Sequence, residues 1–282
     1  MSNALKNVLV TGCSSGIGRC IALGLNQAGY RVIATARKEQ DLGELSELGV
    51  ETLALELRDT RSIQSCMAAV TERTGGQLFG LVNNAAFAQP GAVEDLRREV
   101  LRDQFEVNVF GTQEITNRVI PLMRPQNYGR IVHIGSILGR VSMAFRGAYC
   151  ASKYALEGLA DTQRQELQGS GLSVSLIEPG PISSQFRDNA MSAFDRNIVV
   201  TGSAHRGNYD ELSQILAGGD GRSPAFAKRP EAVLSKVKKA LESHSPKARY
   251  YVTTPAYLMA GMKRVLPTGV LDRILRRASG MR

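Results

Sequence analysis

Several residue types are scarce in this chain of 282 residues. It has no tryptophan, four cysteines and three histidines. The cysteines form no C-x-x-C pair, and His133, His205 and His244 lack the spacing of metal ligands. The scarcity therefore excludes a disulfide framework and predicts that the protein binds no metal. Cysteine usage of this kind is typical of a reducing compartment.

Long apolar segments are also missing. No run approaches the roughly 20 apolar residues that a membrane-spanning helix needs. Residues 1–6 lead directly into an apolar segment without the pattern of a secretory signal. Hydrophobic residues make up 43% of the chain and charged residues 22%, which is typical of a globular protein. We expect one large, cytoplasmic α/β domain with a well-buried core.

Acidic residues are rare near the end of the chain. Residues 222–282 carry 14 Lys/Arg but only 3 Asp/Glu, and they account for the net charge of +9. This basic segment is compatible with an anionic partner, such as a membrane surface or nucleic acid, or with a merely solvated exterior. No nucleic-acid module or interleaved aromatic residues accompany the charges, so we expect no specific nucleic-acid binding.

What the chain does have is a regular alternation of short apolar runs with helical patterns. Most of the runs are continuously apolar, as in strands covered on both faces. Strands are predicted at 7–11, 30–35, 51–57, 78–83, 130–135, 172–178 and 249–253, and helices at 16–29, 41–48, 61–74 and 148–169, among others. This alternation predicts a doubly wound parallel sheet in a single α/β domain over residues 1–255.

Two later segments break the alternation. Residues 181–230 are polar and loop-like, with a glycine-rich stretch at 218–221, and they predict a substrate lid or a structureless loop. Residues 256–282 predict a basic amphipathic helical extension with a break at Pro267. Such a helix lies on an anionic membrane or, more often, packs on its own domain or a partner subunit. Its apolar face consists of Leu258, Met262, Val265 and Leu266, followed by Val270, Leu271, Ile274, Leu275 and Ala278.

A glycine-rich turn follows the first predicted strand. Residues 11–18 read TGCSSGIG, and a helix begins within them. Glycines at such a turn let the backbone approach a pyrophosphate, which the free N–H groups of the helix N-terminus bind. The alternative is a plain strand–helix turn, because the spacing differs from the commoner G-x-G-x-x-G.

The end of the second predicted strand bears on the choice of cofactor. Positions 35 and 36 hold no acidic residue that would bind a ribose 2′-hydroxyl, and Arg37 follows 19 residues after Gly18. A guanidinium at this place suits a 2′-phosphate. The sequence therefore favours NADP(H) over NAD(H), unless Arg37 and Lys38 merely open a solvated helix.

Three polar residues follow the fifth strand at specific spacings. Ser136 ends that strand, and Tyr149 and Lys153 stand four apart in a predicted helix, hence on one face. A free tyrosine is a poor base at neutral pH. The Lys153 ammonium, together with a positively charged nicotinamide, would favour the phenolate. Ser136 would then hold a substrate oxygen while Tyr149 gives or takes its proton.

With these residues the sequence resembles the short-chain dehydrogenase/reductase family over nearly its whole length. The family's T-G-x-x-x-G-x-G stands at 11–18, its N-N-A-G at 83–86 and its P-G at 179–180. The resemblance implies a Rossmann fold with strand order 3-2-1-4-5-6-7, a homo-oligomer, and Asn108 as a fourth catalytic residue, which helps to hold a water in a proton relay to Lys153. It further implies cofactor contacts from Gly12, Ser14, Ser15, Gly16, Ile17, Gly18, Arg37, Glu56, Leu57, Asn84, Ala85, Ala86, Tyr149, Lys153, Pro179, Gly180, Ile182 and Ser184.

Ala86 and Glu56 depart from the family pattern, in which a glycine and an aspartate stand at their places, but neither change removes a catalytic group. Residues 34–38 and 178–186 resemble the retinol/steroid-type and aldehyde-reducing branch, which implies a lipophilic aldehyde or ketone, or the corresponding alcohol. The apolar residues expected near the substrate are Phe87, Ile137, Leu138 and Phe145, with Phe186, Met191 and Phe194 in the lid. A non-catalytic dinucleotide sensor or membrane scaffold is the alternative function, which a missing catalytic residue would favour.

Overall fold

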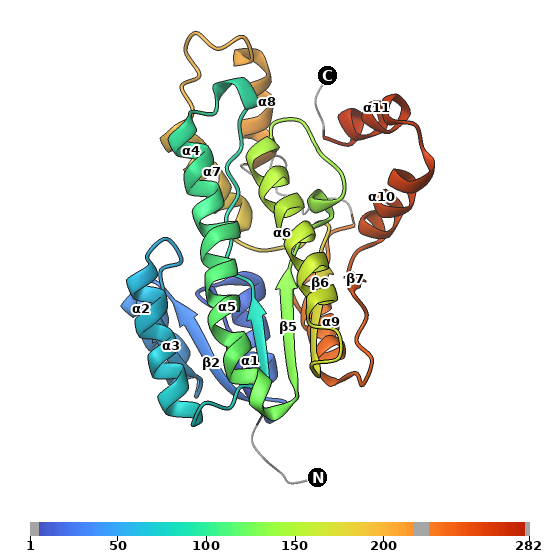
Figure 1. The fold of residues 1–282 in the computed structure, drawn as a ribbon. Coiled ribbons are helices and arrows are strands. Elements are labelled where there is room, and N and C mark those ends of the chain that lie inside the picture. Colours follow the sequence, from blue (N-terminus) through green and yellow to red (C-terminus); the bar gives the residue numbers. More distant parts are fainter. Residues whose placement is uncertain (1–5, 217–225, 280–282) are drawn as a thin grey trace.

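The computed structural model describes residues 6–216 and 226–279. Its seven strands form one parallel sheet in the order β3-β2-β1-β4-β5-β6-β7 (Figure 1). The strands are β1 Asn7–Val10, β2 Arg31–Ala36, β3 Glu51–Ala54, β4 Gly80–Asn83, β5 Gly129–Ile134, β6 Leu172–Glu178 and β7 Arg249–Tyr251. The predicted doubly wound sheet and its strand order are confirmed.

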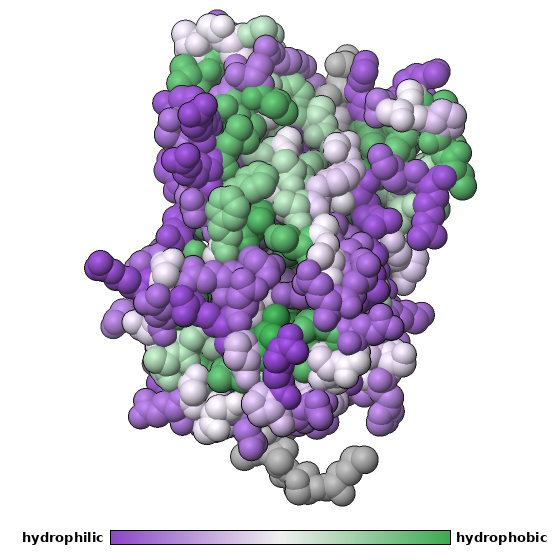
Figure 2. All heavy atoms as spheres, viewed as in Figure 1, coloured by the Kyte–Doolittle hydropathy of each residue, from purple (hydrophilic) through white to green (hydrophobic). Residues whose placement is uncertain are grey.

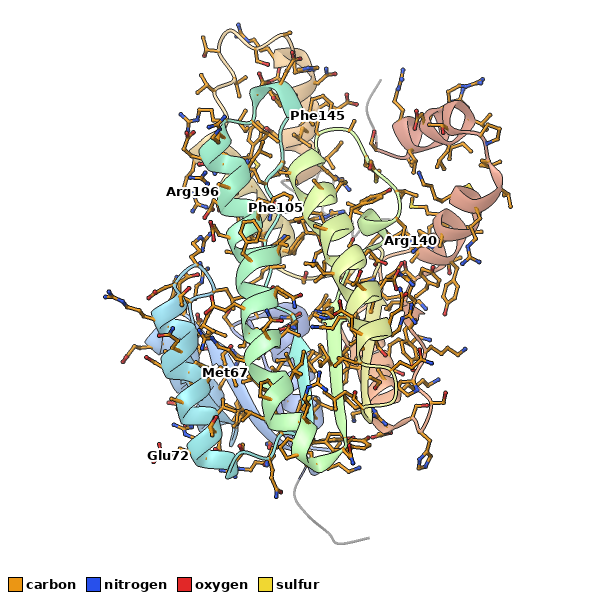
Figure 3. The ribbon with its side chains drawn as sticks, in the orientation of Figure 1. Met67, Glu72, Phe105, Arg140, Phe145 and Arg196 are labelled. Atoms are coloured by element: carbon orange, nitrogen blue, oxygen red, sulfur yellow. The ribbon has the colours of Figure 1, made fainter. Side chains whose placement is uncertain are left out.

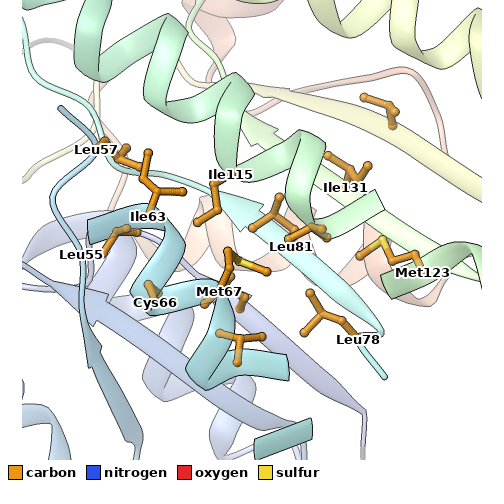
Figure 4. Packing of buried hydrophobic residues seen from close by; sticks show 14 of the residues in the cluster. Leu55, Leu57, Ile63, Cys66, Met67, Leu78, Leu81, Ile115, Met123 and Ile131 are labelled. Atoms are coloured by element: carbon orange, nitrogen blue, oxygen red, sulfur yellow. The ribbon is translucent and has the colours of Figure 1, made fainter. Parts of the chain in front are cut away.

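Helices cover both faces of the sheet. One face carries α1 Gly16–Asn26, α2 Glu39–Glu47 and α9 Glu231–Glu242, and the other carries α3 Thr60–Thr74, α5 Thr112–Met123 and α6 Gly147–Glu166. Because both faces are covered, every residue of β1, β4 and β5 is buried. Each face has its own hydrophobic core; Figure 4 shows the one beneath α3 and α5, where Leu81 and Ile131 meet Ile115.

Some predicted boundaries are wrong because apolar runs extend beyond the strands. The strand predicted to end at 57 ends at Ala54, yet Leu55 and Leu57 are buried after the chain has left the sheet, although β3 itself is only partly buried. Likewise β7 ends at Tyr251, while Val252 is buried beyond it. A continuous apolar run reports burial, and burial continues into the loops at the edge of this sheet.

The segment expected to be loop-like contains two helices, so that part of the prediction is wrong. They are α7 Phe186–Asn197 and α8 Arg206–Leu216. Their buried residues recur at helical spacing, as in Tyr209, Leu212 and Leu216, but intervening polar residues obscured the pattern. Both pack near η1 (Val93–Asp95) and α4 (Arg98–Phe105) in a separate apolar cluster. The glycine-rich stretch at 218–221 lies outside the described residues.

The chain ends in two helices beside the sheet. They are α10 Thr254–Val265 and α11 Thr268–Ala278, separated at Pro267 as the sequence predicts. Leu271 and Leu275 of α11 are buried against the chain's own domain. Within the described ranges, no helix has the combination of length and apolar character that crossing a bilayer requires.

Candidate active site

The carboxyl ends of β1, β4 and β5 lie at one edge of the sheet. The strand order reverses direction between β1 and β4, and in open α/β sheets ligands bind outside the carboxyl ends of the strands at such a point. The glycine turn follows β1, residues 83–86 end and follow β4, and Ser136 follows β5. The predicted site residues from three distant parts of the sequence thus reach one edge.

Glycine is required at two positions of the turn. Gly12 has a φ of +70°, and a Cβ there would lie 2.7 Å from the Cα of Ala85. A Cβ on Gly18 would lie only 2.1 Å from the carbonyl oxygen of Gly12. The turn therefore folds tightly back against the start of α1, and it leaves the backbone itself as the binding surface.

The N-terminus of α1 is open for an anion. Ser15 stands at the N-cap, but its side chain makes no capping hydrogen bond, and the first turn contains no acidic residue. The first backbone N–H groups of a helix have no partner within the helix, and they carry the positive end of its dipole. Together with the glycine turn, this end fits the pyrophosphate of a dinucleotide.

Thr11 and Asn84 hold the two loops together. The Thr11 hydroxyl accepts hydrogen bonds from the backbone N–H groups of Asn84 and Ala85, both at 3.0 Å. The Asn84 side-chain amide donates to the carbonyl oxygens of Thr11 (3.0 Å) and Gly12 (2.9 Å). Thr11 was not among the predicted site residues, although it opens the motif. The Asn84 side chain is thus occupied in shaping the turn.

Arg37 lies just beyond β2 on the same edge. Its side chain is 63% exposed, and its Nη1 lies 3.7 Å from Oε2 of Glu56. Glu56 also pairs with Arg58, which binds Asp103 in turn. The structure thus brings Arg37 and Glu56 together and leaves the Arg37 guanidinium accessible. Leu57, by contrast, is buried, with its carbonyl group against Gly111.

Tyr149 and Lys153 occupy the first turns of α6, and Ser136 faces Tyr149. Lys153 is almost completely buried and donates from Nζ to the carbonyl oxygen of Ile134 at 2.8 Å. Its Nζ lies 5.6 Å from the centre of the Tyr149 ring. The Ser136 hydroxyl accepts from the N–H of Leu138 at 3.1 Å. The geometry therefore assembles the predicted Ser–Tyr–Lys group at the carboxyl edge of β5.

Burial dominates the electrostatics of these groups. It raises the pKa of Tyr149, against the smaller lowering effects of a hydrogen bond with Ser136 and of the Arg146 charge. It lowers the pKa of Lys153 to about 8, although the Glu157 carboxylate opposes that shift. Without cofactor, Tyr149 is thus a protonated phenol at neutral pH. The lowering of the Tyr149 pKa expected from the Lys153 ammonium is not seen in this structure, where the lowering comes from Ser136 and Arg146.

Asn108 lies in a π-helical segment, η2 (Glu106–Gly111), between α4 and α5. Its side chain accepts from the N–H of Phe87 and donates to the carbonyl oxygen of Phe87 and to Oγ of Ser152. Ser152 in turn donates to the carbonyl oxygen of Tyr149 at 2.8 Å. Ser152 therefore links the predicted Asn108 to the helix of Tyr149. Sequence reasoning missed this residue, because a serine inside a helix gives no signal of its own.

The loop after β6 closes the other side of the site. The carbonyl oxygen of Pro179 accepts from the N–H of Ile137 at 3.0 Å, which ties this loop to the Ser136 loop. A Cβ on Gly16 would lie 3.0 Å from the Cβ of Ser184, so Ser184 stands at the start of α1. Ile182 forms a bridge with Lys228 and packs on the core beside α1.

Apolar residues from three parts of the chain cover Tyr149. Phe186 of α7 packs edge-on against the Tyr149 ring, with centroids 5.5 Å apart. Ile137 and Leu138 join Tyr149 in a cluster that α10 and α11 complete through Ala256, Ala260, Leu271 and Leu275. Phe145 lies elsewhere: it stands at the start of α6 and packs on His205 and Tyr209, as Figure 3 shows on the side of α8. The expected placement of Phe145 beside the substrate is therefore not what the structure shows.

Residues 6–193 match the family model described as short chain dehydrogenase. The chain belongs to the short-chain dehydrogenase family. It is thus an oxidoreductase that acts on CH–OH donors with NAD(P). Three curated relatives bear names of oxidoreductases or dehydrogenases, in agreement with this assignment. The uncharacterized oxidoreductase YbbO of Escherichia coli (strain K12) is 39% identical over 272 residues, which cover 96% of this chain and 94% of that protein.

Two other relatives of this short-chain dehydrogenase bear names from the expected branch. Retinol dehydrogenase 16 of Mus musculus is 34% identical, with 96% of this chain and 87% of that protein covered. The 17-beta-hydroxysteroid dehydrogenase type 1 of Homo sapiens is 32% identical, with 93% and 82% covered. The resemblance read from residues 34–38 and 178–186 is confirmed.

Solved structures of the family superpose over most of the chain. A short-chain dehydrogenase from Streptomyces avermitilis gives a TM-score of 0.75 at 29% identity, covering 99% of this chain and 97% of its own. A variant of actinorhodin polyketide ketoreductase solved with NADPH gives 0.70 at 28% identity, covering 89% and 97%.

Proposed function

We propose that this short-chain dehydrogenase reduces a lipophilic aldehyde or ketone, of retinoid-like or steroid-like type, with NADPH, and that it also catalyses the reverse oxidation. The observation that carries the proposal is the apolar cover over Tyr149, formed by Phe186, Ile137, Leu138 and the C-terminal helices. Apolar walls with few polar groups suit a lipophilic carbonyl compound. The names of the retinol and hydroxysteroid dehydrogenases among its relatives support the same class.

Each polar residue has a distinct role in this reaction. A nicotinamide cofactor held by the glycine turn and the start of α1 would supply the hydride that the carbonyl carbon accepts. Tyr149, a phenol at neutral pH, donates its proton to the carbonyl oxygen, and Ser136 holds that oxygen by a hydrogen bond. Lys153 stands one turn away, where its charge stabilises the resulting tyrosinate. Asn108 holds the 87–88 segment and, through Ser152, the start of α6, which keeps these groups in place.

Turnover and binding can be separated at Tyr149. Tyr149→Phe removes only the hydroxyl, so NADPH oxidation should stop while NADPH binding, measured by its fluorescence, stays intact. A screen over aliphatic aldehydes, retinoids and steroids, run in parallel with NADPH and NADH, identifies the substrate class. Retained turnover in the variant would refute the role of the phenol. A non-catalytic sensor is not favoured, because all four catalytic positions are filled and three of them meet at one edge.

The preference for NADP(H) rests on Arg37, whose side chain is accessible. The end of β2, directly before Arg37, carries no acidic residue. Hydrogen bonds to a charged group contribute about 1.5–3 kcal/mol. Arg37→Ala should therefore weaken NADPH binding by about 10- to 150-fold and leave NADH binding nearly unchanged. Lys38→Ala, next in the chain, is the matched control. Equal losses for both variants would mean that the two cations merely attract an anion from solution.

We further infer that α7 and α8, within residues 181–230, act as the substrate lid. Phe186 touches Tyr149 directly, whereas Phe194 is buried against Tyr209 at the far side of the lid. Hydrogen bonds from Ser203 and Tyr209 to Asp95 hold α8 to η1. The lid is thus anchored at one end and rests on the catalytic tyrosine at the other.

A homo-oligomer is the proposed assembly. Figure 2 shows an apolar surface between α4 and α6. The exposed large apolar side chains of α6 and of the segments η1 and η2, which flank α4, are Val93, Phe110, Tyr154 and Leu159. Exposed apolar patches of this kind mark interfaces. Phe110, 54% exposed, lies beside Phe105 and suits contact with a second copy. Phe110→Lys should lower the mass measured by sedimentation, and an unchanged mass would contradict this interface.

We place the protein in the cytoplasm, with peripheral membrane contact through α10 and α11. The cysteines Cys13, Cys66 and Cys150 are buried free thiols, as suits a reducing compartment. The two helices carry Lys263, Arg264, Arg273, Arg276 and Arg277 against a single acid, Asp272. Exposed Tyr257, Leu258 and Val265 accompany these cations. Arg276→Glu with Arg277→Glu should abolish co-sedimentation with anionic vesicles; undiminished binding would remove the idea.

A further inference from the structure

Behind the Ser136 loop lies a charged cluster that the reaction as described does not use. Glu157 of α6 and Glu178, the last residue of β6, lie between Arg249 of β7 and Arg140, which follows η4 (Ile137–Gly139). Glu178 is completely buried and Glu157 nearly so. Arg140 is labelled in Figure 3. Four elements thus contribute to one buried charge cluster.

Arg249 is the centre of the cluster. Its Nε and Nη2 donate to the same oxygen of Glu157, Oε2, at 3.0 and 2.8 Å. Its Nε also lies 3.1 Å from Oε1 of Glu178, but without the alignment of a hydrogen bond. Arg140 approaches Oε2 of Glu157 at 3.7 Å. Nη2 of Arg249 also donates to Oδ2 of Asp161 at 2.5 Å. Within the Glu157–Glu178 pair, both arginines therefore approach the same oxygen of Glu157.

Three carboxyl oxygens of the pair are left without a donor. Oε1 of Glu157 and both oxygens of Glu178 are buried and accept no hydrogen bond from the residues that the structure describes. Buried acceptors without partners are costly, and two buried carboxylates in contact repel each other. One proton held between Glu157 and Glu178 removes one of the two negative charges and provides a hydrogen bond between two of these three oxygens. Consistently, burial and the neighbouring Glu157 raise the pKa of Glu178 to about 8.

The cluster contacts the two segments that carry Ser136, Tyr149 and Lys153, and the loop after β6. Glu157 lies one turn after Lys153 on α6, and a Cβ on Gly139 would meet both the Lys153 carbonyl oxygen (3.0 Å) and Cγ of Glu157 (3.1 Å). Glu178 directly precedes Pro179, whose carbonyl oxygen holds the N–H of Ile137. The pair therefore spans the Ser136 loop, the helix of Tyr149 and Lys153, and the loop after β6.

The effect of the Glu157–Glu178 pair on the protonation of Lys153 depends on the other charged groups around them. Glu157 favours the ammonium form of Lys153, whereas burial disfavours it. The other titratable groups around the pair and the lysine are Arg140, Asp161, Arg249 and Tyr251 on the side of the pair, and His133 and Tyr149 on the side of the lysine. His133 is held neutral by burial, so Glu157 is the acidic group nearest along the helix to Lys153.

We propose that Glu157 and Glu178 are positioning residues that share one proton: clamped by Arg249, they fix the Ser136 loop against α6, and their single negative charge keeps Lys153 protonated. The proposal rests on the hydride-transfer activity but on no particular substrate. Glu157→Gln removes the charge and keeps the shape. Glu157→Asp restores the charge. Asp161→Asn is the matched control, because Asp161 binds the same Arg249 one turn farther from Lys153.

The kinetic test is the pH dependence of single-turnover hydride transfer at saturating NADPH, with any carbonyl compound that the screen finds. Glu157→Gln should move the alkaline loss of activity to lower pH by about one unit or more, as expected for charges one helical turn apart. Glu157→Asp should move it back, and Asp161→Asn should leave it in place. A uniform loss of activity with an unmoved alkaline limb would mean a merely structural role and would overturn the proposal.

The second test needs no turnover. Infrared difference spectra of the unsubstituted protein between pH 6 and pH 9 should show one protonated carboxyl group being lost, and Glu178→Gln should lack that band. An identical band in the variant, or none in the unsubstituted protein, would overturn the shared proton. If no carbonyl compound is reduced at all, the proposed function fails while this measurement still decides the proposal.

Discussion

Gly111 offers a sharp test of how the fold supports the site, because it closes the π-helical segment that carries Asn108. A Cβ at this position would lie 2.1 Å from the carbonyl oxygen of Leu57 and 2.8 Å from its carbon. The obstacle is backbone, so no side chain can turn away. Overpacking costs about 1–3 kcal/mol, and the better helix preference of alanine returns up to about 1 kcal/mol. Gly111→Ala should therefore lower the free energy of unfolding by about 2 kcal/mol.

The matched control is Gly158→Ala, an exposed position of α6 where a Cβ meets nothing within 4 Å. That variant should gain up to about 1 kcal/mol from helix preference alone. Thermal unfolding followed by circular dichroism, at one fixed protein concentration, should show Gly111→Ala melting about 4–8 °C lower and Gly158→Ala slightly higher. Equal shifts of the same sign in both variants would refute the reasoning from the Leu57 contact.

Three further outcomes follow from the same geometry. Burial lowers the pKa of Lys153 to about 8, so the lysine should lose its proton as the pH rises through that value. The kcat should therefore decrease on the alkaline side. A single-turnover rate that does not change with pH would contradict this. Burial lowers the pKa of His133 to about 4, so between about pH 6.5 and 4 the unfolded chain binds a proton that the folded chain does not. The free energy of unfolding should therefore decrease as the pH is lowered through that window, by up to about 1.4 kcal/mol per pH unit. In urea titrations, the free energy of unfolding of His133→Gln should depend less steeply on pH. Phe186→Ala, which bares the Tyr149 ring, should raise KM for the carbonyl compound without changing NADPH binding; weakened NADPH binding alone would speak against the lid.

The fold could be predicted because its signals are local. Continuous apolar runs identify strands that are covered on both faces, and the sheet order follows from the family that the motifs indicate. The boundaries could not be predicted, because Leu55 and Leu57 lie in the loop after β3 and are nevertheless more buried than the residues of that edge strand. The helices α7 and α8 could not be predicted for the opposite reason: their apolar residues are interspersed with polar ones, and they pack in a separate cluster rather than on the sheet.

The residues of the candidate site likewise differ in whether the sequence carries a local signal for them. Tyr149 and Lys153 could be predicted because four residues are one helical turn, and Ser136 because it follows a strand. Ser152 and the Glu157–Glu178 pair could not, since their partners are distant in sequence and only the packing of α6 on β6 and η2 brings them together. Residues that act on the substrate leave a pattern in the sequence. Residues that hold them in place need the tertiary structure.

The C-terminal helices show why one pattern can predict two destinations. The apolar face of α11 predicts packing, and the structure buries Leu271 and Leu275 in the cluster that contains Tyr149. The neighbouring Val270 and Ile274 stay partly exposed, and Arg273 lies with them on the outer side. The apolar face that covers the site and the basic face that is proposed to contact an anionic surface therefore lie on opposite sides of the same short segment. An anionic surface bound to the basic face would act on Tyr149 through these helices, so a membrane effect on this enzyme should appear in substrate access and not in cofactor binding.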